Sequence, residues 1–302
     1  MYLRTEATVN ESLEFSGIGV HSGKTSNIKI IPAEVKTGII FKRTDVAENK
    51  SLIKLSTASI VNPVLCTRIV NKDGISMSVV EHLLAAFRIV GITNAIVEVD
   101  SEEIPIMDGS AKIFVEGIRR SGICLQDSFA PAIIINKPVR IANQNGEISI
   151  EPANTSKITL TLSYDRINPV IKNNNSHTCE LDDNLLDIAS ARTFGWLDDY
   201  EKIQTIGGAK GASEENTIII MPDHTIKNSL RYEKELVMHK CLDLIGDLSI
   251  LGYDIIGEIR GINTSHALNN MLIKQIIAEI KTHTIITEVS EQKYSNIKYA
   301  IH

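Results

Sequence analysis

Apolar residues dominate the segment at residues 236–251, LVMHKCLDLIGDLSIL, and its polar residues recur at a regular interval. At the roughly 3.6-residue period of an α-helix, His239, Asp243 and Asp247 fall on one stripe. Most of the remaining circumference is apolar, so we expect the helix to be packed on most sides. Burying two carboxylates costs several kcal/mol unless a positive charge compensates. A His and a carboxylate one turn apart can bind one divalent metal ion; alternatively, these side chains bond nearby backbone groups.

Similar patterning predicts the other elements of the chain. Short runs typical of strands occupy residues 27–31, 38–42, 75–80, 95–99, 132–135, 139–141, 147–151, 157–163 and 255–259. Helices are expected at residues 80–90, ending at Gly91, and at 111–121, with Ser110 as N-cap. The central helix ends near Gly252, a last helix covers about 265–282, and the turn formers of 207–216 predict a loop.

The segment 125–131 combines turn formers with little periodicity, and we place a domain boundary there, giving domains 1–128 and 129–302. The two halves resemble each other weakly. Glu81 and His82 begin a helix that precedes a strand, and His239 lies in a second helix that also precedes a strand. The alternative is that the similarity arose by chance. Otherwise it indicates a duplicated unit of strands and helices, and therefore an α+β fold in which each half layers a sheet against helices.

Composition narrows the class of protein. The 302 residues are 43% hydrophobic and 23% charged, as in a soluble globular protein, and no apolar run is long enough to cross a membrane. The N-terminus lacks the features of a signal peptide. A net charge of −6 argues against nucleic-acid binding. The four cysteines are far apart and lack CxxC spacing, so we expect reduced thiols and a cytoplasmic protein.

A second His–carboxylate pair strengthens the metal interpretation. Glu81 and His82 begin another apolar helix, where a Glu is also favoured simply by the helix dipole. A catalytic zinc ion requires three N or O ligands and an open position. His82, His239 and Asp243 would supply the ligands, with Glu81 beside the metal as a base.

Two further histidines are candidates. His266 begins the last predicted helix, where a cationic form needs a carboxylate partner such as Asp247; otherwise it is an exposed loop residue. His21 lies in GIGVHSGKT at residues 17–25, which resembles a phosphate-binding loop but has Ile18 where the motif needs Gly. These glycines therefore predict a tight turn, with His21 facing a cleft, and not an NTPase.

Five motifs occur in order along the chain: VEHL at 80–83, IPIMDGSA at 104–111, SARTFG at 190–195, HKxxDxxxD at 239–247 and SHALNN at 265–270. Together they closely resemble the UDP-3-O-acyl-N-acetylglucosamine deacetylases, the zinc amidases of lipid A biosynthesis. The resemblance runs from about residue 13 to 272. It implies two similar α+β domains with the active site between them, hydrolysis of the N-acetyl group of a UDP-acyl-sugar, and one Zn²⁺ per chain, with Fe²⁺ as an alternative.

The resemblance also implies roles for particular residues. His82, His239 and Asp243 match zinc ligands, Glu81 the general base, His266 the protonated general acid and Asp247 the group that orients it. By the same resemblance, Thr193 is expected to stabilise the oxyanion, Lys240 and His21 to lie around the sugar and diphosphate, and Leu65 to make an apolar contact with the substrate. Phe194 and the segment 197–220 fall where the family builds a passage for the acyl chain.

The chain departs from the family pattern in two places. Residues 143–147 read NQNGE and lack a basic residue for the diphosphate, and Ala209, Ala212, Glu214 and Glu215 differ from more apolar versions of the acyl region. Two rival functions remain open: a non-catalytic protein that binds a nucleotide sugar or a partner, and a zinc amidase acting on another N-acetyl sugar. We expect a monomer that neither binds nucleic acid nor spans a membrane.

Overall fold

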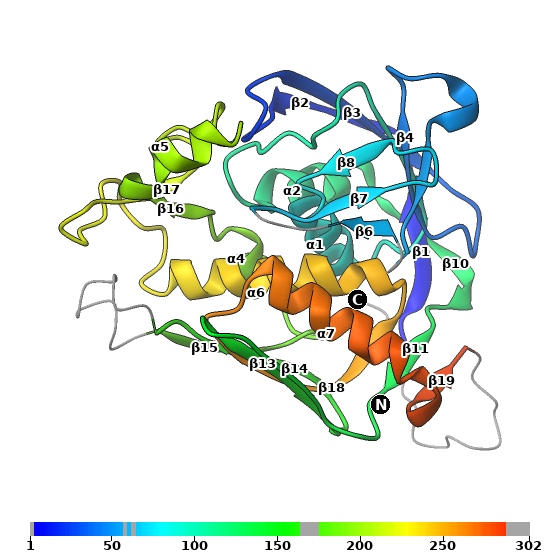
Figure 1. Cartoon of the computed structure of the whole chain (residues 1–302). Coiled ribbons are helices and arrows are strands. Elements are labelled where there is room, and N and C mark those ends of the chain that lie inside the picture. Colours follow the sequence, from blue (N-terminus) through cyan, green and yellow to red (C-terminus); the bar gives the residue numbers. More distant parts are fainter. Residues whose placement is uncertain (1–2, 57–58, 62–64, 164–174, 288–302) are drawn as a thin grey trace.

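Two β-sheets form the outer layers of the molecule, and helices fill the space between them (Figure 1). The computed structural model describes residues 3–56, 59–61, 65–163 and 175–287. Helices α1 (Glu81–Val90) and α2 (Lys112–Ser121) belong to the first half, and α6 (Glu235–Leu248) and α7 (His266–Ala278) to the second. This layering of sheets and helices confirms the predicted α+β class.

When the strands of each half are ranked by their place along the chain, five strands of each main sheet lie side by side in the same order. In the first half the order is β2 (Leu13–Ile18), β3 (Thr25–Pro32), β9 (Ala95–Val99), β4 (Ile39–Arg43) and β5 (Leu52–Lys54). In the second it is β12 (Val139–Ala142), β13 (Glu147–Glu151), β18 (Asp254–Ile262), β14 (Ser156–Thr161) and β15 (Ser176–Glu180). Within each set only the pairing of the third and fourth strands is parallel. The weak sequence similarity thus has a structural counterpart; the division at residues 128 and 129 stays a prediction.

The sheet of the second half is larger than that of the first. Its strand β18 also pairs in parallel with β11 (Ala132–Ile134), which pairs in turn with β19 (Thr284–Ile286). Smaller elements complete the fold: β6 (Ile60–Val61), β7 (Arg68–Val70) and β8 (Ser76–Ser78) form one sheet, and β16 (Phe194–Trp196) pairs with β17 (Ile218–Ile220). Helices α4 (Leu186–Ala189) and α5 (Leu197–Thr205) flank β16. As predicted, residues 207–216 contain no helix or strand.

The predicted helices are present with small changes at their ends. Helix α1 ends at Gly91, which adopts the left-handed conformation, and α6 continues as the 3-10 turn η3 (Ser249–Leu251) before Gly252. The residue preceding α2 is Ala111, so the assignment of Ser110 as N-cap was wrong by one position, although its Oγ accepts a hydrogen bond from Lys112 N. None of the helices in the described ranges is long and apolar enough to cross a membrane.

Two predictions of local structure were wrong. The turn region expected at 125–131 falls largely within the strand β10 (Ile123–Phe129), which pairs antiparallel with β1 (Thr5–Val9). Its side chains are largely exposed, so it lacks the alternating pattern that marks a half-buried strand. The strand expected at 75–80 ends at Ser78, because Val79 adopts a φ of 60°, which interrupts extended backbone.

Helices α1 and α6 pack against each other at the centre of the molecule (Figure 1). Both are apolar over most of their surface, and Leu83, Leu84 and Leu242 are fully buried. At Gly246 the backbone of α6 lies directly against that of α1, and an added Cβ would overlap the carbonyl oxygen of Glu81. The spacing of the two helices therefore depends on a residue without a side chain.

A half-buried ion cluster links the two halves near the C-terminal ends of α1 and α6. Arg4, just before β1, donates two hydrogen bonds to Asp254 at 2.8 and 2.6 Å, and Arg88 Nε of α1 lies 3.3 Å from the same carboxylate. Burial opposes the negative charge of Asp254, but Arg4 and Arg88 outweigh it and lower its pKa to about 2. Asp254 begins β18, so the cluster ties the start of the chain to the second sheet.

We expect Gly246→Ala to lower the free energy of unfolding by about 3 kcal/mol or more, because the new methyl group must push α1 away from α6. Urea denaturation measures the change. Gly195→Ala is the matched control, since a Cβ there meets no described atom within 4 Å. Equal stability of the two variants would contradict the close packing.

We expect Asp254→Asn to remove stability that depends on pH. The pKa of Asp254 is lower in the folded chain than in the unfolded chain, so its contribution is present above about pH 4 and is lost as the pH falls towards 2. The shift corresponds to about 2 kcal/mol. Urea titrations from pH 7 down to pH 3 should show a gap between wild type and variant that narrows on acidification. The exposed Asp73→Asn serves as the control, and a gap independent of pH would refute the assignment.

Candidate metal centre

Three side chains from α1 and α6 converge at the interface of the two helices. His82 Nε2 lies 3.7 Å and His239 Nε2 3.2 Å from Asp243 Oδ1, and one ligand atom from each residue lies within 4.8 Å of the others. All three residues are buried. The structure thus brings together the three ligands predicted from the sequence, one from α1 and two from the predicted stripe of α6.

The hydrogen bonds of these residues fit a bound cation. His239 Nδ1 lies 3.0 Å from the carbonyl oxygen of Ala191, which can only accept, so this nitrogen carries the proton and Nε2 presents a lone pair. Asp243 Oδ1 is buried and has no hydrogen-bond partner in the described part of the chain. A lone pair and a carboxylate oxygen at 3.2 Å repel each other unless a positive charge lies between them. The N, N and O donors are those that zinc and similar divalent ions prefer.

Glu81 and His266 face each other beside this site. His266 Nε2 lies 3.5 Å from Glu81 Oε1 and 3.9 Å from Asp243 Oδ2, while its Nδ1 lies 2.9 Å from Asp247 Oδ2. His266 therefore connects the buried Asp247 to the candidate metal centre. The pairing of His266 with Asp247, expected from the sequence, is present.

The surroundings of Glu81 and His266 raise the pKa of both side chains, for different reasons. Burial raises the pKa of the Glu81 carboxyl to about 8, partly offset by His266 and reinforced by Asp247 and Asp243. Burial disfavours the charged form of His266, but Asp247, Glu81 and Asp243 outweigh it and raise its pKa to about 10. His266 consequently holds a proton at neutral pH, whereas additional positive charge nearby would favour the ionised form of Glu81.

Thr67, which no sequence pattern indicated, contacts Glu81 and Asp247, and its Oγ1 lies 3.2 Å from His266 Nδ1. It is fully buried just before β7, its backbone N–H donates to Glu81 Oε2 at 3.1 Å, and its hydroxyl donates to Asp247 Oδ1. Asn269 Nδ2 donates to the other oxygen of Asp247 at 2.8 Å. A single threonine near a short strand carries no periodic signal, so only the structure identifies it.

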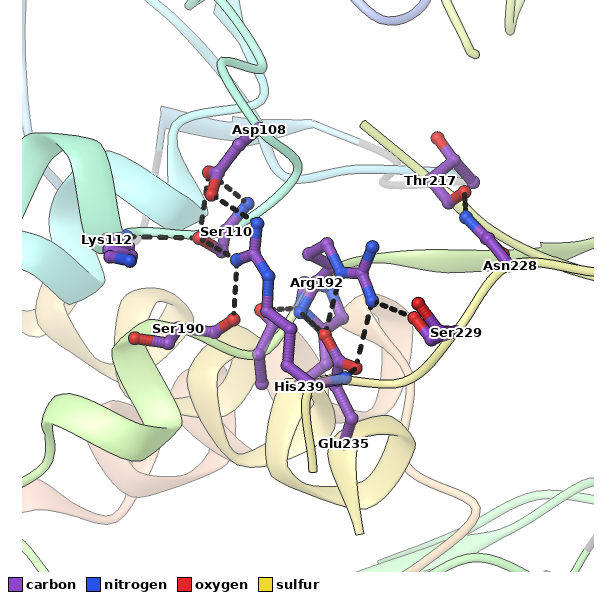
Figure 2. A network of polar contacts seen from close by, with 12 residues as sticks. Asp108, Ser110, Lys112, Ser190, Arg192, Thr217, Asn228, Ser229, Glu235 and His239 are labelled. Atoms are coloured by element: carbon purple, nitrogen blue, oxygen red, sulfur yellow. Dashed lines mark hydrogen bonds and ion pairs between the residues drawn. The ribbon is translucent and has the colours of Figure 1, made fainter. Parts of the chain in front are cut away.

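A second polar network fixes the segment that contacts His239 (Figure 2). The fully buried Glu235 accepts hydrogen bonds from Arg192 Nε at 2.8 Å and Nη2 at 3.2 Å. Arg231 donates to Ser190 O and to Asp108 Oδ2, both at 2.9 Å. This network holds the segment around Ala191 over the start of α6, where its carbonyl oxygen meets His239.

Backbone hydrogen bonds join the same segment to the first half. Thr193 N donates to Gly109 O at 2.8 Å, and Ala111 N donates to Ala189 O at 2.9 Å. Gly109 adopts a φ of 85° and lies against the backbone of Asn216, where a Cβ would overlap the carbonyl oxygen. The IPIMDGSA and SARTFG motifs are therefore neighbours in space, and both support the candidate metal centre.

A cavity of about 540 Å³ opens beside these residues. Glu81, His82, Asp243 and His266 line it, and so do the predicted substrate residues Thr193, Lys240, Phe194, His21 and Leu65. His239 and Asp247 do not line it. Apolar side chains form another part of its wall, including Leu197, Ile203 and Ile219 from the predicted acyl region and Trp196 from just before it. Sequence reasoning did not single out Trp196.

Two of the predicted substrate residues also have partners within the protein. Lys240 Nζ donates to Asp243 Oδ2 at 2.9 Å and lies 5.3 Å from the centre of the Phe194 ring. His21 Nδ1 accepts a hydrogen bond from Ala209 N at 3.3 Å, and burial lowers the pKa of this imidazole. His21 thus joins the predicted turn at 17–25 to the loop at 207–216. Residues 143–147, where the chain departs from the family pattern, form the turn of the β12–β13 hairpin and the first residue of β13. They do not line this cavity.

Two comparisons of the sequence with known proteins give consistent matches. The family model for UDP-3-O-acyl N-acetylglycosamine deacetylase matches residues 6–278. Relatives named UDP-3-O-acyl-N-acetylglucosamine deacetylase occur in Shewanella violacea, at 37% identity over 95% of this chain and 94% of the relative. Others occur in Ruthia magnifica, at 34% identity over 97% and 96%, and in Photobacterium profundum, at 36% over 95% and 95%.

We expect the purified chain to contain about one divalent metal ion and His239→Ala/Asp243→Ala to contain almost none, since two of three ligands are lost. Metal analysis of the purified proteins measures the stoichiometry. His177→Ala/Asp187→Ala is the matched control, because it removes a neighbouring His and Asp outside the cavity. Full metal content in the ligand variant would disprove the ligand assignment.

Proposed function

Because the chain belongs to the UDP-3-O-acyl-N-acetylglucosamine deacetylase family, we propose that it hydrolyses the N-acetyl group of a UDP-3-O-acyl-N-acetylglucosamine. The products are the free amine and acetate, and the reaction is the committed step of lipid A biosynthesis. One observation carries the proposal: an unpaired buried carboxylate oxygen and two imidazole nitrogens converge beside Glu81 and His266 in one cavity. A protein that only binds a sugar has no need of this combination.

We propose that His82, His239 and Asp243 hold Zn²⁺, with Fe²⁺ as the alternative ion. When bound, such an ion polarises a carbonyl group and makes water nucleophilic at neutral pH. His239 is held in the required tautomer by Ala191 O, and Asp243 is held by Lys240 as well as by its place on α6. These contacts orient the donors before an ion binds.

Glu81 and His266 then divide the proton transfers. Glu81 Oε1 faces the centre and accepts a proton from the attacking water, while His266 Nε2 donates a proton to the departing nitrogen of the amide. Asp247 stabilises the imidazolium of His266 and fixes its ring through Nδ1. We assign the hydroxyl of Thr193, which lines the cavity, to the oxyanion that develops on the acetyl carbonyl.

The rest of the cavity supports an acylated sugar as the substrate. A hydrocarbon chain could lie against the apolar wall formed by Leu65, Phe194 and the apolar part of segment 197–220. Its transfer out of water is energetically favourable. Lys240 and His21 line the same cavity and suit the sugar and its diphosphate. We further propose a monomeric cytoplasmic enzyme without nucleic-acid partners, supported by the four free thiols and the net negative charge.

We expect His266→Ala to keep its metal ion and to lose about 10²- to 10⁴-fold in kcat, because the proton donor is removed and the ligands are not. Metal analysis and acetate release from the acylated UDP-sugar provide the two readouts. His177→Ala, a half-buried histidine on β15, is the control and should retain full activity.

The same assay with UDP-N-acetylglucosamine distinguishes the rival functions. Equal turnover of the acylated and non-acylated sugars would favour an amidase for other N-acetyl sugars. Binding of the acylated sugar without acetate release by the metal-loaded protein would favour a non-catalytic binding protein.

A further inference from the structure

Thr67 lies between Glu81 and the Asp247–His266 pair, the groups that carry out and support the proposed proton transfers. Glu81 is 14 residues away and Asp247 is 180 residues away, and Thr67 contacts each of them. The threonine is fully buried, and it does not line the cavity. It therefore has contacts to both groups without being placed to touch a substrate.

The backbone of Thr67 is fixed on both sides. Its carbonyl oxygen accepts a hydrogen bond from Val79 N at 3.0 Å, two residues before Glu81. Its N–H donates to Glu81 Oε2 at 3.1 Å. Because Oε2 is engaged in this way, the second oxygen, Oε1, is the one that faces His266.

The hydroxyl of Thr67 completes the set of donors around Asp247. It has one proton, and the carboxylate oxygen Oδ1 can only accept, so the hydroxyl donates to Asp247. The opposite oxygen, Oδ2, receives His266 Nδ1 at 2.9 Å and Asn269 Nδ2 at 2.8 Å. Since Asp247 is fully buried and cannot bond water, these donors determine the plane of its carboxylate.

We propose that Thr67 is a positioning residue for the proton transfers, which aims Glu81 through its N–H and the Asp247–His266 pair through its hydroxyl. The inference rests on the proposed function. Loss of the hydroxyl leaves Asp247 Oδ1 unsatisfied and frees the carboxylate to rotate, so His266 loses its fixed orientation. Within the described part of the chain, Thr67 forms no hydrogen bond with the proposed ligands His82, His239 and Asp243, so their ability to hold an ion stays intact.

Thr67→Val tests the hydroxyl, because valine keeps the shape of the side chain and the backbone N–H. We expect kcat for the acylated UDP-sugar to fall roughly 10- to 100-fold, the typical effect of losing a supporting hydrogen bond at such a site. KM and metal content should stay within about twofold, because neither substrate contacts nor ligands change. Thr67→Ser restores the hydroxyl and should recover most of kcat.

The buried threonine Thr8 provides the matched control. Its hydroxyl accepts a hydrogen bond from Ala33 N at 2.9 Å in the first half, outside the cavity. Thr8→Val should leave kcat unchanged, which separates the loss of a buried hydroxyl from a role in positioning. If Thr67→Val fails to fold, Thr67→Ala removes the same hydroxyl without adding a methyl group in its place.

A proton NMR measurement supplies a readout that does not depend on turnover. The imidazole proton shared by His266 and Asp247 should give a low-field resonance in the wild type, identified by its absence in His266→Ala. We expect this resonance to persist in Thr67→Ser and to shift or broaden in Thr67→Val. Wild-type protein that releases no acetate would contradict the proposed function, while the NMR comparison would still test Thr67.

Either of two results would overturn the proposal. The first is a Thr67→Val enzyme with unchanged kcat and an unchanged resonance. The second is a Thr67→Val protein that folds but loses its metal, which would make Thr67 a support of the ligands and not of the proton transfers.

Discussion

One close backbone contact underlies the whole candidate centre: α6 lies against α1 where Gly246 meets Glu81. A side chain at this position would separate the helices, and with them His82 from Asp243. Buried apolar residues of both helices belong to one hydrophobic cluster, so the hydrophobic core and the candidate metal site are built by the same packing. The ligand geometry is therefore a consequence of helix packing and not of a flexible loop.

Charge is the second constraint on this interface. Glu81, Asp243 and Asp247 are buried within reach of one another, and His266 is the cation that faces all three. The polar residues on α6 have different contacts according to their position along the helix. His239 and Asp243 face the candidate metal centre, whereas Asp247, one turn later, faces His266. Such a group is stable only when each member is paired, which explains why so many supporting hydrogen bonds surround it.

The sequence predicted the features that have a period or a motif. Polar residues at helical spacing on α6 indicated the candidate ligands His239 and Asp243, and the ordered motifs indicated the residues that lie beside them. Strand β10 was not predicted because its exposed side chains give no alternating pattern. Glu235 was not singled out because the helix dipole alone explains a glutamate at a helix start. Thr67 could not be predicted because its contacts depend on tertiary structure: Glu81, Asp247 and His266 come from three different helices, 14, 180 and 199 residues away.

The separation of α1 from α6 along the chain also affects synthesis. After α1 leaves the ribosome, roughly 150 further residues must follow before α6 can cover its apolar surface. At about 5–20 residues per second, this surface is open for on the order of 10–30 seconds. The nascent first half is then a candidate for aggregation or for binding by a chaperone, and slow translation through the second half would prolong that exposure.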